Sequence, residues 1–275
     1  MGTTTDWQSR EAHGITLYYE AAEQEAAALI GAATIQTAEL LHDTWGLATP
    51  ANCRVYVMTD WPPFLFHAVG EPRRTLYRIT MPLWRRRVDR MWPLVGGWSL
   101  FMRGMSVATI KAPRLLATAD TSIGQHLFIK ETDLDIRACH ITAHELTHAF
   151  TTHLRLPVWL HEGLAMSMVD KLLGHVTVQP ATLGLLANPP DKIPTSYRRL
   201  DVRNVETAVF VYARGYWLTR YLLETRPELL RELLARRYRH REIETQIADV
   251  VGIDRKNFWP TLTPVLNAHF ADSSA

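Results

Sequence analysis

Residues 140–165 read HITAHELTHAFTTHLRLPVWLHEGLA, and this stretch decides both the fold class and the candidate chemistry. Its first half has helical character and contains an H-E-x-x-H at residues 144–148. Residues four apart on an α-helix project from nearly the same side, one turn of about 5.4 Å apart. His144 and His148 can therefore bind one zinc ion. Glu145 lies about 100° around the helix, where it can take a proton from an attacking water instead of binding the metal.

A catalytic zinc site of this kind needs a third protein ligand and an open position for water. Glu162 follows His148 after thirteen intervening residues, which is enough for the helix to end, turn at Pro157 and return antiparallel. Gly163 removes a side chain where two helices would approach closely. We predict Glu162 as the third ligand. The alternative is that Glu162 is a carboxylate in the first turn of the second helix, where the helix dipole favours it.

Residues 144–148 and 157–165 (PVWLHEGLA) resemble the peptidase MA-like gluzincins. These zincin metallopeptidases carry H-E-x-x-H on one helix and a glutamate ligand in an E-G-L-A helix. Residues 212–222 (YARGYWLTRYL) are similar to their downstream helix, with Gly215 where serine is common. The resemblance covers residues 140–225, a third of the chain. It implies a hydrolase, specifically a protease, with one Zn²⁺ held by His144, His148 and Glu162 and with Glu145 as general base.

The chain departs from related patterns at several positions. Thermolysin-like gluzincins place an aspartate four residues after the ligand glutamate to orient a ligand histidine, and this chain has Met166 there. Asp170 is two turns on and fits less well, so no residue is assigned to that supporting role. The metzincin pattern would require glycine and histidine where the chain has Thr151 and Leu154, so that class is excluded.

Two tyrosines are candidates for stabilising the oxyanion. Tyr212 and Tyr216 are four apart on one predicted helix face, and we favour Tyr212. Tyrosines that only pack this helix against the core would give the same pattern.

The remaining histidines are interpreted mostly as surface or packing residues. His140 lies one turn before His144, but about 11 Å of helix separates it from His148, too far for both to bind one ion. It is therefore expected to line the cleft or support a ligand. His153 and His161 fall at or beside the turn between the helices and are expected to be solvated.

The composition is that of an ordinary folded protein: 275 residues, 47% of them hydrophobic, with a net charge of +2. This charge argues against bulk nucleic-acid binding. The basic run at residues 236–241 (RRYRHR) is flanked by glutamates and is interpreted as a solvated helix face. Two cysteines, Cys53 and Cys139, allow at most one disulfide.

The hydrophobic pattern predicts an α+β or α/β core, with a small N-terminal sheet with helices and a mainly helical C-terminal part. Together with this pattern, the resemblance to the gluzincins implies an α+β, zincin-like metallopeptidase fold. We expect a single domain over residues 1–275, with lobes at 1–153 and 154–275. Strands are predicted at 14–20 and 54–59, and residues 126–130 (HLFIK) are predicted as an edge strand for pairing with substrate. Helices are predicted at 21–45 with Gly46 as C-cap, at 134–153, at 158–174, and from 205 onward with a break at Arg226-Pro227.

Residues 61–118 are the least regular part of the sequence, with six prolines and four tryptophans. We interpret them as an irregular subdomain with buried aromatic residues and solvated arginines. The less favoured interpretation is an element that covers the substrate or that contacts a membrane surface, the latter through residues 81–103. The first residues lack the features of a signal peptide, which favours a cytoplasmic location. A mature chain that had lost a leader would look the same.

The sequence therefore predicts a zinc-dependent metallopeptidase that acts on a peptide or protein, with no nucleic-acid partner. The alternative is a catalytically inactive zinc-binding scaffold or interaction protein on the same fold.

Overall fold

The computed structural model describes residues 6–69, 73–102, 104–117, 122–197, 199–201 and 203–271. The expected α+β class is confirmed, because a small five-stranded N-terminal sheet is followed by a mostly helical remainder. Contacts group the chain into two compact units. The first comprises Met1–Glu39, Thr49–Thr121 and Glu131–Phe150, and the second comprises Leu40–Ala48, Ser122–Lys130 and Thr151–Ala275. Residues 1–5, which contribute to the expectation of no signal peptide, lie outside the described residues.

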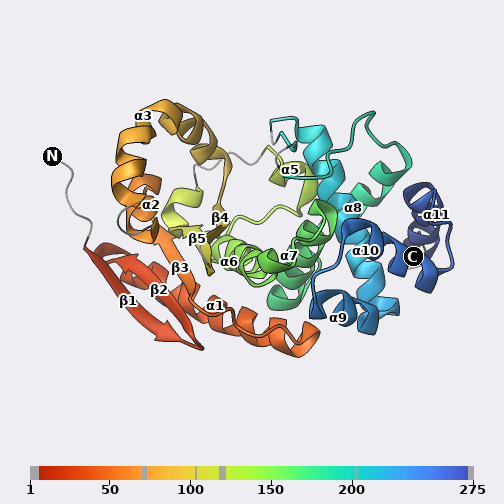
Figure 1. The fold of residues 1–275 in the computed structure, drawn as a ribbon, viewed down its shortest axis with the longest axis horizontal. Helices are drawn as coiled ribbons and strands as arrows, with labels where there is room; N and C mark the ends of the chain where they lie inside the picture. Colours follow the sequence, from red (N-terminus) through yellow and green to blue (C-terminus); the bar gives the residue numbers. More distant parts are fainter. Residues whose placement is uncertain are drawn as a thin grey trace. The chain divides into compact units, whose positions relative to one another are not determined.

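The first unit is built on a sheet with strand order β1-β2-β3-β5-β4 (Figure 1). The hairpin of β1 (Trp7–Ala12) and β2 (Ile15–Glu20) turns through His13 and Gly14, both at positive φ. Two such residues form the tight turn whose twist matches paired strands. The predicted second strand is confirmed as β3 (Cys53–Met58), parallel to β2. The predicted first helix is confirmed as α1 (Gln24–Trp45), which Gly46 ends at φ +71°.

The described residues of 61–118 are not irregular, and the prediction of an irregular subdomain is wrong. They form α2 (Trp61–Val69), α3 (Arg73–Met91), η2 (Trp92–Leu94), β4 (Gly97–Met102), β5 (Met105–Lys111) and α4 (Pro113–Leu116). The antiparallel hairpin of β4 and β5 completes the sheet, with β5 parallel to β3. Within the described sheet, β4 is therefore an edge strand.

Helix α3 lacks the buried apolar face by which a helix is usually recognised from its sequence. It contains Pro82, and none of its residues is buried. Its apolar residues Leu76, Ile79 and Leu83 are 59%, 71% and 87% exposed, so the pattern contains no core-facing stripe. The indole Nε1 of Trp61 donates a hydrogen bond of 2.9 Å to Asp89 of α3, which ties α3 to α2. The arginines at 85–87 are exposed, as expected. Of the four tryptophans only Trp61 is buried, and the other three are half-buried, so the expectation of buried aromatic residues is met only in part.

Lys111, at the end of β5, is a buried cation. Its ammonium lies 4.3 Å from the ring centroid of Trp92 and donates to the Trp92 carbonyl oxygen. Burial lowers the pKa of Lys111 from 10.5 to about 8. Between these two pH values the folded chain binds fewer protons than the unfolded chain, so stability rises with pH across this window.

We expect Lys111→Met to remove this pH dependence. The free energy of unfolding of the wild type, relative to the variant, should rise by about 1–3 kcal/mol between pH 8 and 10.5. Urea denaturation at both pH values measures the difference. The same substitution at exposed Lys256 is the control, and parallel behaviour of the two variants would contradict the prediction.

The second unit is helical. It contains α5 (Gly124–Leu127), η3 (Thr152–Leu154), α7 (Val158–Leu173), η4 (Pro180–Ala187), α8 (Val205–Thr225), α9 (Pro227–Ala235), α10 (His240–Val251) and α11 (Phe258–Ala271) (Figure 1). The predicted helix at 158–174 and the break at Arg226-Pro227 are confirmed. The predicted strand at 126–130 is wrong: His126 belongs to α5, and only Phe128 makes an isolated bridge, to Val178. Five residues are too few to distinguish a helical turn from a strand by pattern alone.

Helices α7 and α8 cross at two glycines. A Cβ on Gly163 would lie 2.2 Å from the carbonyl oxygen of Gly215, and a Cβ on Gly215 would lie 1.9 Å from that of Trp159. A residue without a side chain is therefore needed at Gly163, but the expected approach to the helix of His144 and His148 is not what requires it. The partner helix at these contacts is α8, and not the helix that carries the histidines.

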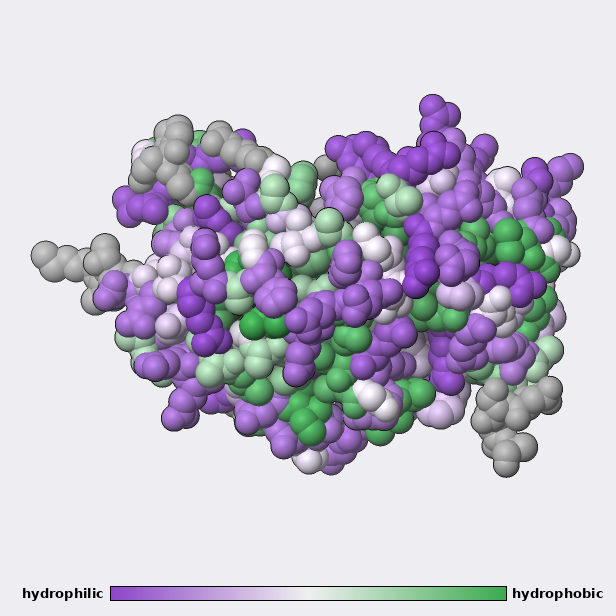
Figure 2. Space-filling model, turned by 90° about the horizontal axis from the view of Figure 1, so that it is seen from below, coloured by the Kyte–Doolittle hydropathy of each residue, from purple (hydrophilic) through white to green (hydrophobic). Residues whose placement is uncertain are grey.

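The surface of the described residues carries mixed side chains. Figure 2 shows hydrophilic residues interspersed with hydrophobic ones over one face. Among the described residues, no helix combines the length and apolar character that crossing a membrane requires.

Candidate metal centre

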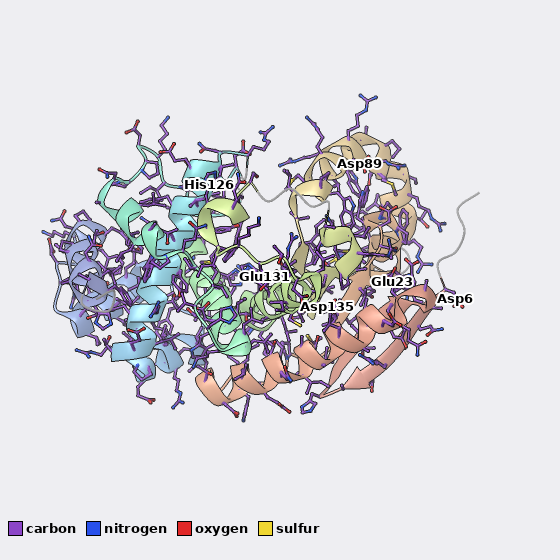
Figure 3. The ribbon with its side chains drawn as sticks, turned by 180° about the vertical axis from the view of Figure 1, so that it is seen from behind. Asp6, Glu23, Asp89, His126, Glu131 and Asp135 are labelled. Carbon is purple, nitrogen blue, oxygen red and sulfur yellow. The ribbon has the colours of Figure 1, made fainter. Side chains whose placement is uncertain are left out.

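The two histidines of the motif lie on α6 (Leu134–Thr151), which confirms the predicted helix. Asp133 caps its start, because the Oδ1 atom accepts from the backbone N–H groups of Asp135 (2.8 Å) and Ile136 (3.2 Å). Asp135 adds a carboxylate to the first turn, where the helix dipole favours it (Figure 3). Local sequence therefore sets where this helix begins, and with it the position of the motif.

His144 and His148 point their Nε2 atoms at one another. These atoms are 3.1 Å apart, and the two rings are nearly perpendicular at 87°. Two nitrogens bound to one tetrahedral zinc at 2.0–2.1 Å would be about 3.3 Å apart. The pair thus has the separation that a shared zinc ion requires. His148 is buried and His144 is half-buried, which leaves one side of the pair accessible.

Glu145 is buried on the same helix and lies against the edge strand β4. A Cβ on Gly97 would be 3.0 Å from Glu145 Cγ, and a Cβ on Gly96 would be 2.4 Å from Ile141 Cδ1. These two glycines at the start of β4 allow α6 to pack close to the strand. Glu145 is therefore held beside the strand edge and is separate from the predicted ligands.

Glu162 lies on α7 and is 2% exposed. The first turn of α7 contains no acidic residue, so the alternative of a first-turn carboxylate favoured by the helix dipole is wrong. Its Oε1 atom accepts a hydrogen bond of 2.6 Å from the hydroxyl of Tyr197. Carboxylates that bind metals are usually oriented by such a hydrogen bond.

Tyr197 also contacts His161, at 2.8 Å from its Nδ1 atom. Because the single hydroxyl proton is donated to Glu162, Nδ1 of His161 must carry the proton that it donates to Tyr197. The chain His161–Tyr197–Glu162 holds the carboxylate in one orientation. His161 is only 8% exposed, so the prediction that it is solvated is wrong. His153 is exposed, as predicted.

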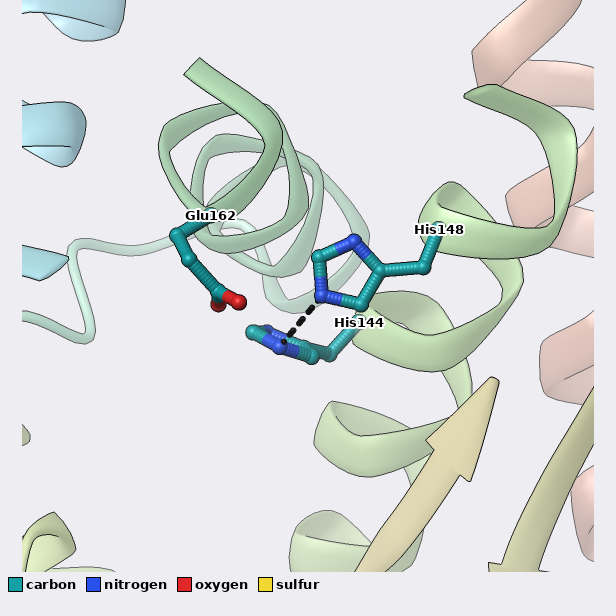
Figure 4. A group of neighbouring side chains, drawn as sticks. All are labelled: His144, His148 and Glu162. Atoms are coloured by element: carbon teal, nitrogen blue, oxygen red, sulfur yellow. Dashed lines mark hydrogen bonds between the residues drawn. The ribbon is translucent and has the colours of Figure 1, made fainter. Parts of the chain in front are cut away.

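The structure brings the three predicted ligands together: one ligand atom from each of His144, His148 and Glu162 lies within 4.8 Å of the others (Figure 4). Within the described part of the chain, this is the one group of at least three His, Cys, Asp or Glu residues with such spacing. Two imidazoles and one carboxylate are also the donor set of a catalytic zinc site with an open fourth position. The residues therefore fit the metal that the sequence implies.

The other candidate residues, Asp170, Tyr216 and Tyr212, are not part of the metal-ligating group. Tyr216 donates a hydrogen bond of 2.6 Å to Asp170, which also accepts from the backbone and the hydroxyl of Thr177. Burial raises the pKa of Asp170 above its usual range, although these hydrogen bonds oppose the shift. Asp170 and Tyr216 thus stabilise the second unit, which agrees with the packing interpretation of Tyr216. Tyr212 is half-buried on α8, and its oxyanion role stays a prediction.

The two cysteines are free. Cys53 is buried in β3, and burial raises the pKa of its thiol to about 12, so it is not a reactive thiolate. Cys139 is partly buried on α6, and burial together with Asp135 and Asp133 raises its pKa. Neither residue belongs to the metal-ligating group.

Tyr197 is the residue of this site that the sequence did not indicate. It lies 35 residues after Glu162 in a loop, and no motif surrounds it. Only the folded chain brings its hydroxyl to the carboxylate.

No protein-family model matches this chain, and a search of the curated proteins found no match to it.

Proposed function

We propose that the protein is a zinc-dependent metallopeptidase of the gluzincin type. The observation that carries the proposal is the His144, His148 and Glu162 group, with one ligand atom of each within 4.8 Å of the others, beside Glu145. When bound, a zinc ion would act there as a Lewis acid on the scissile carbonyl and would lower the pKa of water.

The side chains of this site would act either as metal ligands or as the general base. His144 and His148 would bind as neutral imidazoles, and Glu162 would bind as a carboxylate oriented by Tyr197. Glu145 would take a proton from the attacking water and return it to the leaving amine, which is the role of a general base and then a general acid.

The edge strand β4 supplies a way to hold an extended peptide. A substrate that adds a strand to this edge would form backbone hydrogen bonds with β4. Gly97 begins β4 and lies against Glu145, so the scissile bond would pass near the general base. Residues 126–130 do not form a strand and so offer no edge for this pairing.

We expect the purified chain to bind one equivalent of zinc. His148→Ala should weaken zinc binding by more than about 100-fold, because loss of even a supporting residue around a metal weakens binding 10- to 100-fold. Metal analysis and a competition titration with a chelator measure both quantities. His153→Ala is the matched control, since His153 is exposed and follows the same helix.

The activity itself is tested by digesting a mixed peptide library with chelated and with zinc-reconstituted protein. Cleavage that appears only with zinc supports the peptidase. Stoichiometric zinc without cleavage identifies the alternative, a zinc-binding scaffold or interaction protein. Absence of zinc binding by the wild type would contradict both.

A further inference from the structure

A basic hollow of about 760 Å³ lies in the second unit, and none of its lining residues belongs to the metal-ligating group. Three segments line it: the residues between the end of η3 and the start of α7, the loop before α8, and the residues before and at the start of α10. The lining residues are Arg155, Leu156, Val158, Thr195, Ser196, Tyr197, Arg237, Tyr238, Arg239, His240 and Glu242. We call this hollow the Arg155 pocket. Its volume is within the range of about 300–1,000 Å³ that is usual for ligand sites.

The charge of the Arg155 pocket is strongly positive. Arg155, Arg237 and Arg239 line it with exposed side chains. The one acidic residue in the lining is Glu242, and its Oε2 atom already accepts from the backbone N–H of Arg239 at 2.8 Å. Three guanidinium groups against one occupied carboxylate favour an anionic ligand, and guanidinium groups match a carboxylate with two parallel hydrogen bonds.

The N-termini of two helices add to the positive charge of the pocket. The sixteen-residue α7 and the twelve-residue α10 both begin at the pocket, at Val158 and His240. The start of a helix carries a partial positive charge. His240 donates from Nε2 to the carbonyl oxygen of Arg155 at 3.0 Å, so the α10 end of the lining is fixed to the Arg155 end. The cations are thus arranged around a defined hollow.

Tyr197 connects the pocket to the candidate metal centre. Its side chain lines the pocket, while its hydroxyl donates to Glu162 Oε1 at 2.6 Å. A single side chain therefore separates a ligand in the pocket from a predicted zinc ligand. Because Tyr197 borders both places, one part of a peptide could occupy the pocket while a neighbouring part lies at the candidate metal centre.

We propose that the Arg155 pocket binds a carboxylate of the peptide substrate, from an Asp or Glu side chain or from a free C-terminus. The inference rests on the proposed peptidase function and adds a substrate class to it. The pocket selects anionic substrates, and Arg155, Arg237 and Arg239 provide the recognition.

The test measures binding without turnover. Three fluorescent hexapeptides of otherwise identical sequence are titrated into the full-length Glu145→Gln protein: an amidated peptide with one Glu, the same peptide with Gln, and the Gln peptide with a free C-terminus. We expect one or both carboxylate peptides to bind at least about 10-fold more tightly than the amidated Gln peptide, as a charge-assisted hydrogen bond would give. The comparison of the two carboxylate peptides distinguishes a side chain from a C-terminus.

Charge reversal locates the binding site. Arg237→Glu in the same background should remove the preference, whereas Arg241→Glu, an exposed arginine on α10 outside the lining, should retain it. Equal affinities for all three peptides, or equal effects of the two reversals, would overturn the inference. Inorganic phosphate that binds more tightly than either carboxylate peptide would also overturn it, because the pocket would then be a phosphate site.

Failure of this inference and failure of the proposed function give different results. Cleavage of the peptide library by the wild type without preference for carboxylates removes the pocket inference and leaves the peptidase. Selective binding that Arg237→Glu abolishes, without cleavage by the zinc-loaded wild type, removes the peptidase and leaves the Arg155 pocket as a peptide-binding site.

Discussion

Glu145→Gln is expected to reduce kcat/KM for peptide cleavage by about 10²–10⁴-fold, the usual contribution of a general base. The amide has nearly the same size and fits the same buried position beside Gly97, but it cannot accept the proton of the attacking water. Zinc binding should be unchanged, because Glu145 is not part of the metal-ligating group. Steady-state kinetics on a cleaved library peptide, together with metal analysis, measure both properties.

The control for this variant is Glu228→Gln, the same change at a residue whose side chain is 79% exposed on α9. It should retain wild-type activity. Retention of more than about a tenth of the activity by Glu145→Gln would show that another group moves the proton. Loss of zinc by this variant would instead place Glu145 among the residues that hold the metal.

Gly215→Ala is expected to destabilise the second unit by about 3 kcal/mol or more. On helix propensity alone, alanine would stabilise a helix interior by about 1 kcal/mol relative to glycine. The added Cβ, however, would lie 1.9 Å from the carbonyl oxygen of Trp159, which is backbone and cannot rotate away. Helices α7 and α8 would have to separate, and overpacking of this kind costs about 1–3 kcal/mol even when side chains can adjust. The steric effect therefore exceeds the propensity effect.

Chemical denaturation measures this loss, with Gly184→Ala as the matched control. A Cβ on Gly184, in η4 of the same unit, would contact nothing within 4 Å. The two variants should differ in denaturation midpoint at a similar m-value. A Gly215→Ala protein that is as stable as the wild type would mean that the two helices do not cross as closely as described.

The elements predicted best are those whose signals are local. The limits of α6 follow from Asp133 at its start, and α7 follows from Pro157 before it and Gly174 after it. Each of these residues acts through its own backbone geometry, so its effect is visible in a short window of sequence.

The elements predicted worst depend on distant partners. The hairpin of β4 and β5 joins the sheet by pairing with β3, which lies about fifty residues earlier. Helix α3 presents Leu76, Ile79 and Leu83 to solvent, so the positions of its hydrophobic residues do not indicate which face packs against the core. The position of His161 near a turn predicts a solvated side chain, but the fold buries it against Tyr197.

The sequence by itself determined the His144 and His148 pair and the neighbouring Glu145, because i, i+1 and i+4 positions on a helix have a geometry that no later folding step changes. It also indicated Glu162 and the need for a small residue at Gly163. Only the tertiary structure decided that Gly215 is the partner of that glycine, that Tyr197 orients Glu162, and that Arg155, Arg237 and Arg239 surround one hollow. The physical reason is that these contacts join segments 35 to 85 residues apart, whose meeting depends on how whole helices pack.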